Sequence, residues 1–105
     1  MTNGDKVMQV AAREVGVHEV PWGSNSGQRV RQYQAATSLG GTGWPWCGAW
    51  CEWVYKAAGV PDDDLAHQAT SEIAVRAYRQ DANVSYPVVG AMLVWPGRHV
   101  SMIER

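Results

Sequence analysis

The chain has 105 residues, with 9 Lys plus Arg against 10 Asp plus Glu, so its formal charge is −1. This length suffices for one modest hydrophobic core, and we therefore expect residues 1–105 to form a single domain. The balanced charge lacks the basic excess that contact with a polyanion needs, which argues against a nucleic-acid partner.

No apolar run approaches the ~20 residues of a membrane-spanning helix. The polar segment 1–5 also lacks the basic and apolar regions of a signal peptide. We therefore expect no membrane partner, and synthesis in the cytosol. The two cysteines, Cys47 and Cys51, fall within one predicted helix and do not form the spaced framework of a disulfide-stapled module, so we expect reduced thiols.

The first predicted element is an amphipathic helix that begins at the N-cap residue Asn3 and ends near Gly16. Its inward face carries Val7, Val10 and Ala11, which recur at helical spacing.

Segment 17–27 is rich in Gly, Ser, Asn and Pro, which is typical of an ordered loop. Helical spacing returns over 29–37, with Val30 and Tyr33 on one face, and the glycines of segment 40–43 end it.

The third helix, 47–58, has the clearest boundaries. Gly59 stands where a left-handed C-terminal residue belongs, and Pro61 prevents continuation. Segment 62–65 is predicted to form one turn.

A fourth helix is predicted over 72–79, capped by Ser71, with Ile73, Ala77 and Tyr78 facing inward.

After the fourth helix, the apolar residues no longer recur at helical spacing. Segments 88–95 and 100–103 are β-branched and apolar, and the turn 96–98 separates them, which predicts a hairpin. Helices first and strands last indicate an α+β fold, with the N-terminal helices packed on one face of a small antiparallel sheet.

Cys47 is the first residue of the predicted third helix, and His99 stands at the start of the last strand. A thiol at a helix N-terminus faces unsatisfied N–H groups and the positive end of the helix dipole, which favours the thiolate. The two residues are therefore candidates for a nucleophile and its general base. The alternative is that Cys47 and His99 are both structural residues. Cys51, one turn further along the same helix and flanked by two tryptophans, has the features of an inert core thiol.

Three stretches, 15–27, 44–50 and 97–103, resemble the CHAP amidohydrolase/peptidases and related papain-like peptidoglycan hydrolases of phage endolysins. The resemblance covers most of the chain. Its most specific part is Trp44-Pro45-Trp46-Cys47-Gly48-Ala49-Trp50, because in these enzymes the nucleophilic Cys follows an aromatic residue and opens a helix with small residues behind it.

The resemblance implies a papain-like fold in which Cys47 is the nucleophile and His99 the base. It implies cleavage of an amide bond in bacterial peptidoglycan, by an endopeptidase or an N-acetylmuramoyl-L-alanine amidase, with no cofactor. It further implies a protein held in the host cytoplasm until it is released to the cell wall.

By the same resemblance, Glu19 and Asn25 shape the cleft. Trp44, Trp46 and Trp95 are candidates to line it, since their faces suit glycan or the alkyl parts of a stem peptide. Simpler interpretations remain open: Asn25 forms a turn, Glu19 is a surface charge or a helix-end partner, and the tryptophans are core packing.

Two features depart from the family. The Gly-Asp that relatives tend to carry before the penultimate strand is Gly90-Ala91 here. A polar third residue, which usually follows the His on a later strand, is also missing. Glu104 is a poor substitute, because it lies an odd number of strand residues from His99. We therefore expect the third residue to lie beyond Arg105 in a longer parent protein; the alternative is that the site works as a Cys–His dyad. A sheet that lacks its last strands has an unpaired edge strand, which favours self-association.

Two other functions compete with hydrolysis. The first is a non-catalytic wall-binding module, in which the tryptophans grip sugar and Cys47 is incidental. The second is a metal site with Cys47, Cys51 and His99, His18 or His67 as ligands, although the sequence supplies only half of a structural zinc pattern.

Overall fold

A computed structural model of the protein describes residues 1–61 and 64–104. Its elements, in chain order, are α1 (Asn3–Arg13), α2 (Gln28–Ala35), α3 (Cys47–Ala58), α4 (Thr70–Arg79), β1 (Met92–Trp95) and β2 (His99–Met102). Four helices followed by a two-stranded antiparallel sheet confirm the predicted α+β class. The predicted turn over 62–65 includes residues 62 and 63, which lie outside the described part.

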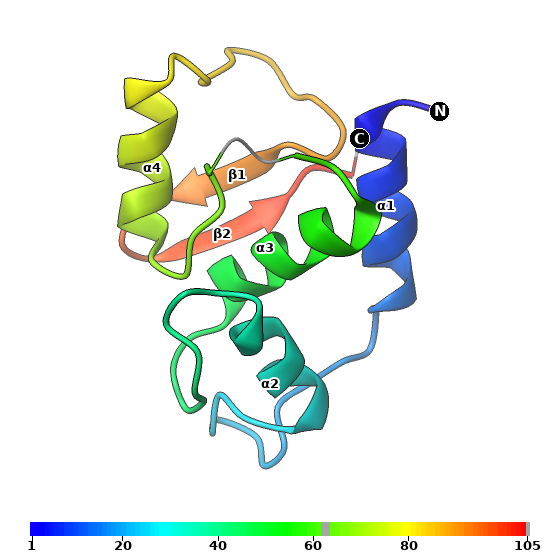
Figure 1. The fold of residues 1–105 in the computed structure, drawn as a ribbon, viewed down its shortest axis with the longest axis vertical. Coiled ribbons are helices and arrows are strands. Elements are labelled where there is room, and N and C mark those ends of the chain that lie inside the picture. Colours follow the sequence, from blue (N-terminus) through cyan, green and yellow to red (C-terminus); the bar gives the residue numbers. More distant parts are fainter. Residues whose placement is uncertain (62–63, 105) are drawn as a thin grey trace.

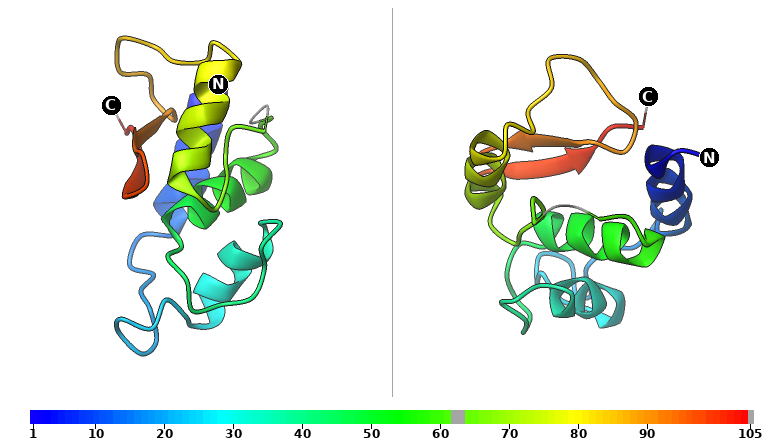
Figure 2. Two further views of the ribbon diagram at one scale, coloured as in Figure 1. Left: turned by 90° about the vertical axis from the view of Figure 1, so that its left-hand side faces the viewer. Right: turned by 45° about the horizontal axis from the view of Figure 1, so that its top comes forward.

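Helix α3 lies at the centre of the molecule (Figure 1). The β1–β2 hairpin and α2 lie on opposite sides of it (Figure 2), α1 packs against it, and α4 packs beside β1. Only some of the helices therefore cover the sheet directly. The elements with extensive contact to the hairpin are α3 and α4, whereas α1 and α2 pack mainly on α3.

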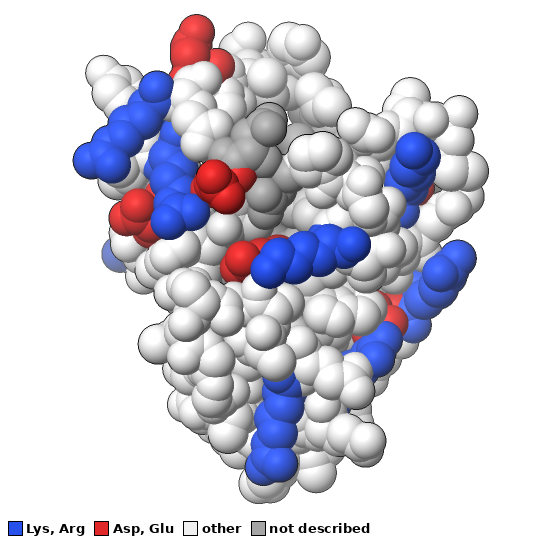
Figure 3. All heavy atoms as spheres, in the orientation of Figure 1, with Lys and Arg blue, Asp and Glu red and all other residues white. Residues whose placement is uncertain are grey.

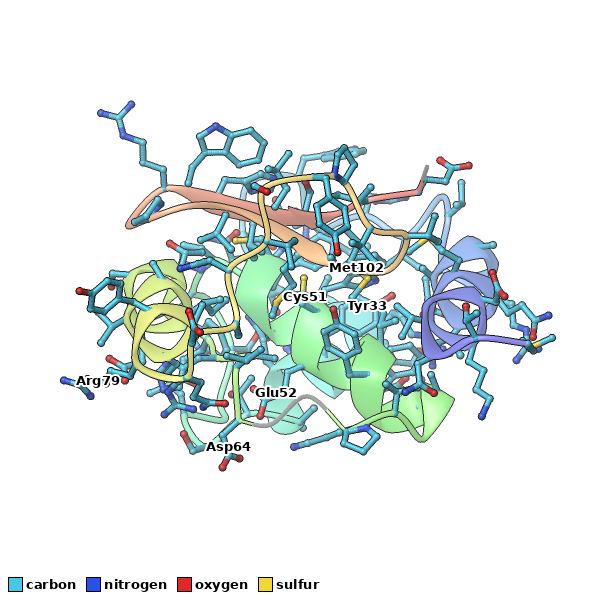
Figure 4. The ribbon with its side chains drawn as sticks, turned by 90° about the horizontal axis from the view of Figure 1, so that it is seen from above. Tyr33, Cys51, Glu52, Asp64, Arg79 and Met102 are labelled. Atoms are coloured by element: carbon cyan, nitrogen blue, oxygen red, sulfur yellow. The ribbon has the colours of Figure 1, made fainter. Side chains whose placement is uncertain are left out.

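The core has two clusters that share α3. One joins α1 to α3 through Val7, Val54, Tyr55 and Ala66. The other joins α3, α4 and the hairpin through Cys51, Ile73 and Val100. Figure 4 shows Cys51 and Met102 between α3 and the hairpin, and Glu52 on the opposite side of α3.

The start of α1 differs from the prediction. The N-cap is Thr2 and not Asn3, because Thr2 and Asp5 form a reciprocal capping box: Thr2 Oγ1 accepts the Asp5 N–H at 3.1 Å, and Asp5 Oδ2 accepts the Thr2 N–H at 3.0 Å. The helix also ends earlier than expected, at Arg13.

Helix α4 also begins earlier than predicted. Its first residue is Thr70 and its N-cap is Ala69, so Ser71 lies inside the helix and the predicted cap is wrong. Ile73 is buried as predicted, but Tyr78 is 81% exposed and faces solvent.

The predicted hairpin is confirmed, with Met92 paired to Met102 and Trp95 paired to His99. The first strand is shorter than expected, because Gly90 has a positive φ of 84° and the chain still turns at that point. The Gly90 carbonyl accepts the Tyr55 hydroxyl at 2.5 Å, which fixes the start of the hairpin to α3. Among the described residues, β2 pairs only with β1, so self-association through its outer edge stays a prediction.

Gly48, the second residue of α3, is buried against the segment that precedes α4. A Cβ atom at this position would lie 2.2 Å from the backbone carbonyl oxygen of His67 and 3.1 Å from that of Gln68. The first turn of α3 therefore needs a glycine to approach this segment so closely.

We expect Gly48→Ala to lower the free energy of unfolding by about 1–3 kcal/mol, the usual cost of overpacking. Helix propensity alone predicts the opposite sign, since Ala favours a helix interior by roughly 1 kcal/mol over Gly. Urea denaturation followed by circular dichroism measures the difference. As a control, Ala57→Gly at an exposed position of the same helix should follow propensity and destabilise. A Gly48→Ala protein more stable than wild type contradicts the close approach.

Candidate active site

One groove runs between α1, the start of α3 and β2, with a volume of about 1460 Å³. Both predicted catalytic residues, Cys47 and His99, line it. The groove is also lined by Glu14, Asn25, Tyr33, Trp46, Trp50 and Glu104. Residues far apart in the sequence thus line one groove.

Cys47 is partly buried and is the first residue of α3, as predicted. The N-cap residue is Trp46, which provides no side-chain cap; its carbonyl accepts the Trp50 N–H at 2.8 Å. The N–H groups of a first helical turn have no partner within the helix. The thiol therefore stands beside backbone donors at the positive end of the helix dipole.

His99 is exposed and is the first residue of β2, as predicted. Its imidazole stacks on Trp95, with 5.9 Å between ring centroids and 30° between ring planes. Within residues 1–61 and 64–104, no side chain hydrogen-bonds the ring, although Glu104 lines the same groove. Trp95 is therefore the side chain that orients the imidazole in this structure.

Cys51 does not line the groove; it lies in the core between α3 and the hairpin and is fully buried. Burial raises the pKa of its thiol far above the ordinary value, and the nearby Cys47 raises it further. Cys51 is therefore held as a neutral thiol and serves as packing.

Trp46 forms the wall beside Cys47 and is fixed on two sides. Its indole Nε1 donates to Glu19 Oε1 at 3.0 Å. Its ring stacks on Tyr33, with 5.5 Å between centroids and 18° between planes. Tyr33 is fully buried and also meets Trp53 edge-on at 5.2 Å.

The Glu14 carboxylate joins the end of α1 to α2. Glu14 Oε1 accepts the Tyr33 hydroxyl at 2.7 Å, and its two oxygens accept Arg29 Nε at 2.6 Å and Nη2 at 2.9 Å. The Glu14 side chain is only 7% exposed. Hydrogen bonding from Arg29 lowers the pKa of Glu14, with a further contribution from Tyr33, so the carboxylate stays charged.

The predicted substrate-contacting residues do not all line the groove. Trp46 and Asn25 line the groove with Cys47, whereas Trp44, Glu19 and Trp95 do not. The indole of Trp44 donates instead to the Gly40 carbonyl at 2.8 Å. Glu19 bonds to Trp46 and to the Gly23 N–H, at 2.6 Å. Asn25 has a positive φ of 51°, so the expected turn is also present.

Sequence reasoning missed Glu14, Arg29 and Trp50. Glu14 and Arg29 are separated by a loop, and no local pattern marks two such residues as partners. Tyr33 was predicted to face inward, and its burial confirms this, but its contact with Trp46 depends on how α2 packs on α3.

The charged side chains on the face shown in Figure 3 are of both signs, with several of opposite sign side by side, and they form no continuous basic patch. Within the described part of the chain, no group of three or more His, Cys, Asp or Glu residues could hold a metal ion. None of the described helices is both long and apolar enough to cross a membrane.

Comparisons of the chain with protein-family models, with curated proteins and with solved structures found no match.

The ion pair between Glu14 and Arg29 predicts how the stability of the fold depends on pH. Because the folded protein lowers the pKa of Glu14, its contribution is complete above the ordinary carboxyl value of about 4.3 and is lost as the pH falls through the lower, folded value. We expect Glu14→Gln to cost about 1–3 kcal/mol near neutral pH and to weaken the fall in stability on acidification. Urea denaturation at several pH values measures both effects.

Glu72→Gln is the matched control, because Glu72 pairs with Arg76 at 3.2 Å on the surface of α4. Such an exposed pair is worth about 0–0.5 kcal/mol. Equal losses of unfolding free energy from the two substitutions would contradict a larger stabilisation by the Glu14 contacts than by an ordinary ion pair on a helix.

Proposed function

We propose that the protein is a cysteine-dependent hydrolase of amide bonds in bacterial peptidoglycan, with a papain-like arrangement of Cys47 and His99. The observation that carries this proposal is that these two residues, far apart in the sequence, line one groove. The position of Cys47 at the first turn of α3 supports a nucleophile, and the exposed imidazole at the start of β2 supports a base.

In the proposed reaction, the His99 imidazole takes the proton from Cys47 Sγ. The thiolate attacks the carbonyl carbon of the amide, and the electron pair moves to the carbonyl oxygen. When the tetrahedral intermediate collapses, the C–N bond breaks, the leaving amine takes the proton from His99, and a thioester remains. Water, deprotonated by His99, then hydrolyses the thioester and restores the thiol.

The negative charge on the carbonyl oxygen needs hydrogen-bond donors. The backbone N–H of Cys47 is the best candidate, since it lies in the first turn of a helix and has no intrahelical acceptor.

The walls of the groove suit a substrate with both apolar and polar parts. Trp46 and Trp50 supply aromatic faces, Met8 and Ala12 of α1 supply aliphatic surface, and Asn25 supplies a polar group. An extended peptide with short alkyl side chains, as in a peptidoglycan stem, fits this composition.

The test is to incubate wild type, Cys47→Ala and His99→Ala with purified sacculi, following turbidity and the masses of the released fragments. We expect clearing by wild type and a loss of at least about 10³-fold in Cys47→Ala. The fragment masses identify the bond. Cys51→Ala is the matched control and should clear sacculi like wild type, because its thiol is buried away from the groove.

The wall-binding alternative gives a different pattern. If no protein clears sacculi while wild type and Cys47→Ala sediment with them equally, the chain binds the wall without cutting it, and the proposal of hydrolysis is wrong.

A further inference from the structure

Glu19 has both carboxylate oxygens occupied within the protein. Oε1 accepts the Trp46 indole N–H at 3.0 Å and Oε2 accepts the Gly23 backbone N–H at 2.6 Å. Hydrogen bonding from Trp46 lowers the pKa of Glu19, and the backbone N–H groups of Gly23 and Asn25 act in the same direction. These bonds favour a charged, internally bonded carboxylate over one that is free to receive substrate.

The bond to Trp46 spans 27 residues of sequence, from the loop after α1 to the N-cap residue of α3. Trp46 is the N-cap of α3, and its own side chain makes no capping bond. Its conformation is therefore set from outside the helix, by the bond from its indole and by its stacking on Tyr33.

The two constraints act at right angles. Stacking on Tyr33 fixes the plane of the indole but permits it to slide within that plane. The hydrogen bond to Glu19 acts at the edge of the ring and fixes its position within the plane. Together they hold the indole of Trp46, the residue directly before Cys47 in the chain.

We propose that Glu19 is a positioning residue, which sets the reactivity of Cys47 by holding the indole of Trp46 through its Nε1. This inference rests on the proposed function for its meaning in catalysis, but its effect on the Cys47 thiol is measurable without any substrate.

The experiment is a double-mutant cycle of Glu19→Gln and Trp46→Phe. The readout is the rate at which iodoacetamide alkylates Cys47, located by mass spectrometry of peptides. Gln offers one acceptor oxygen to two N–H donors, whereas Phe keeps a ring for stacking on Tyr33 but has no N–H. Trp46→Phe also leaves the charge of Glu19 in place, which separates positioning from a change in local charge.

We expect each single substitution to slow alkylation on the order of tenfold, and the double variant to be no slower than the slower single variant. The matched control, Glu72→Gln, lies on the surface of α4 and should leave the rate unchanged. Rates equal to wild type in both single variants, or two independent losses that multiply in the double variant, overturn the proposal.

Turnover on sacculi separates this inference from the proposed function. If the cycle shows coupling but wild type clears no sacculi, positioning by Glu19 stands and hydrolysis fails. If wild type clears sacculi and Glu19→Gln matches it in both alkylation and turnover, hydrolysis stands and positioning fails. Where both stand, Glu19→Gln lowers turnover of sacculi together with the rate of Cys47 alkylation.

Discussion

The stacking of Tyr33 on Trp46 ties α2 to the residue directly before Cys47, which itself packs against the core of α3, α4 and the hairpin. Tyr33 is buried on α2, Trp46 is the N-cap of α3, and the Tyr33 hydroxyl donates to Glu14, which follows α1. A charged carboxylate that is 7% exposed must have its hydrogen bonds satisfied, and Arg29 and Tyr33 do this. These polar contacts join α1 to α2, and the stacking of Tyr33 on Trp46 joins both to the end of α3 that carries the thiol.

The opposite side of α3 is apolar and holds the hairpin. Val100 and Cys51 pack together there, so successive residues of β2 have different surroundings: Val100 is in the core and His99 is exposed. The same alternation that anchors the strand presents the imidazole at the groove. Two cysteines on one helix thus have separate roles, since Cys51 secures the hairpin while Cys47 faces the opening.

Much of this arrangement could be predicted from the sequence, because local patterns carry it. The left-handed Gly59 marks the end of α3, two β-branched and apolar segments separated by a turn mark the hairpin, and the aromatic segment before Cys47 marks the helix start. Helix starts were less predictable, because Thr2 and Asn3 are both good caps and only the reciprocal bond with Asp5 selects Thr2.

The side-chain partners of the site could not be predicted. Glu19 and Asn25 both lie in the loop after α1. Only Asn25 lines the groove, whereas Glu19 accepts a hydrogen bond from the Trp46 indole. Such outcomes depend on how distant elements pack, and a single sequence has no local signal for that.

The central claim is that Cys47 and His99 act as a pair. The most direct measurement is the rate of alkylation of each cysteine, near neutral pH, in wild type and in His99→Ala. The account predicts rapid modification of Cys47 in wild type, a rate on the order of tenfold lower in His99→Ala, and no modification of the buried Cys51 in either folded protein. Equal rates at Cys47 in the two proteins would contradict the account.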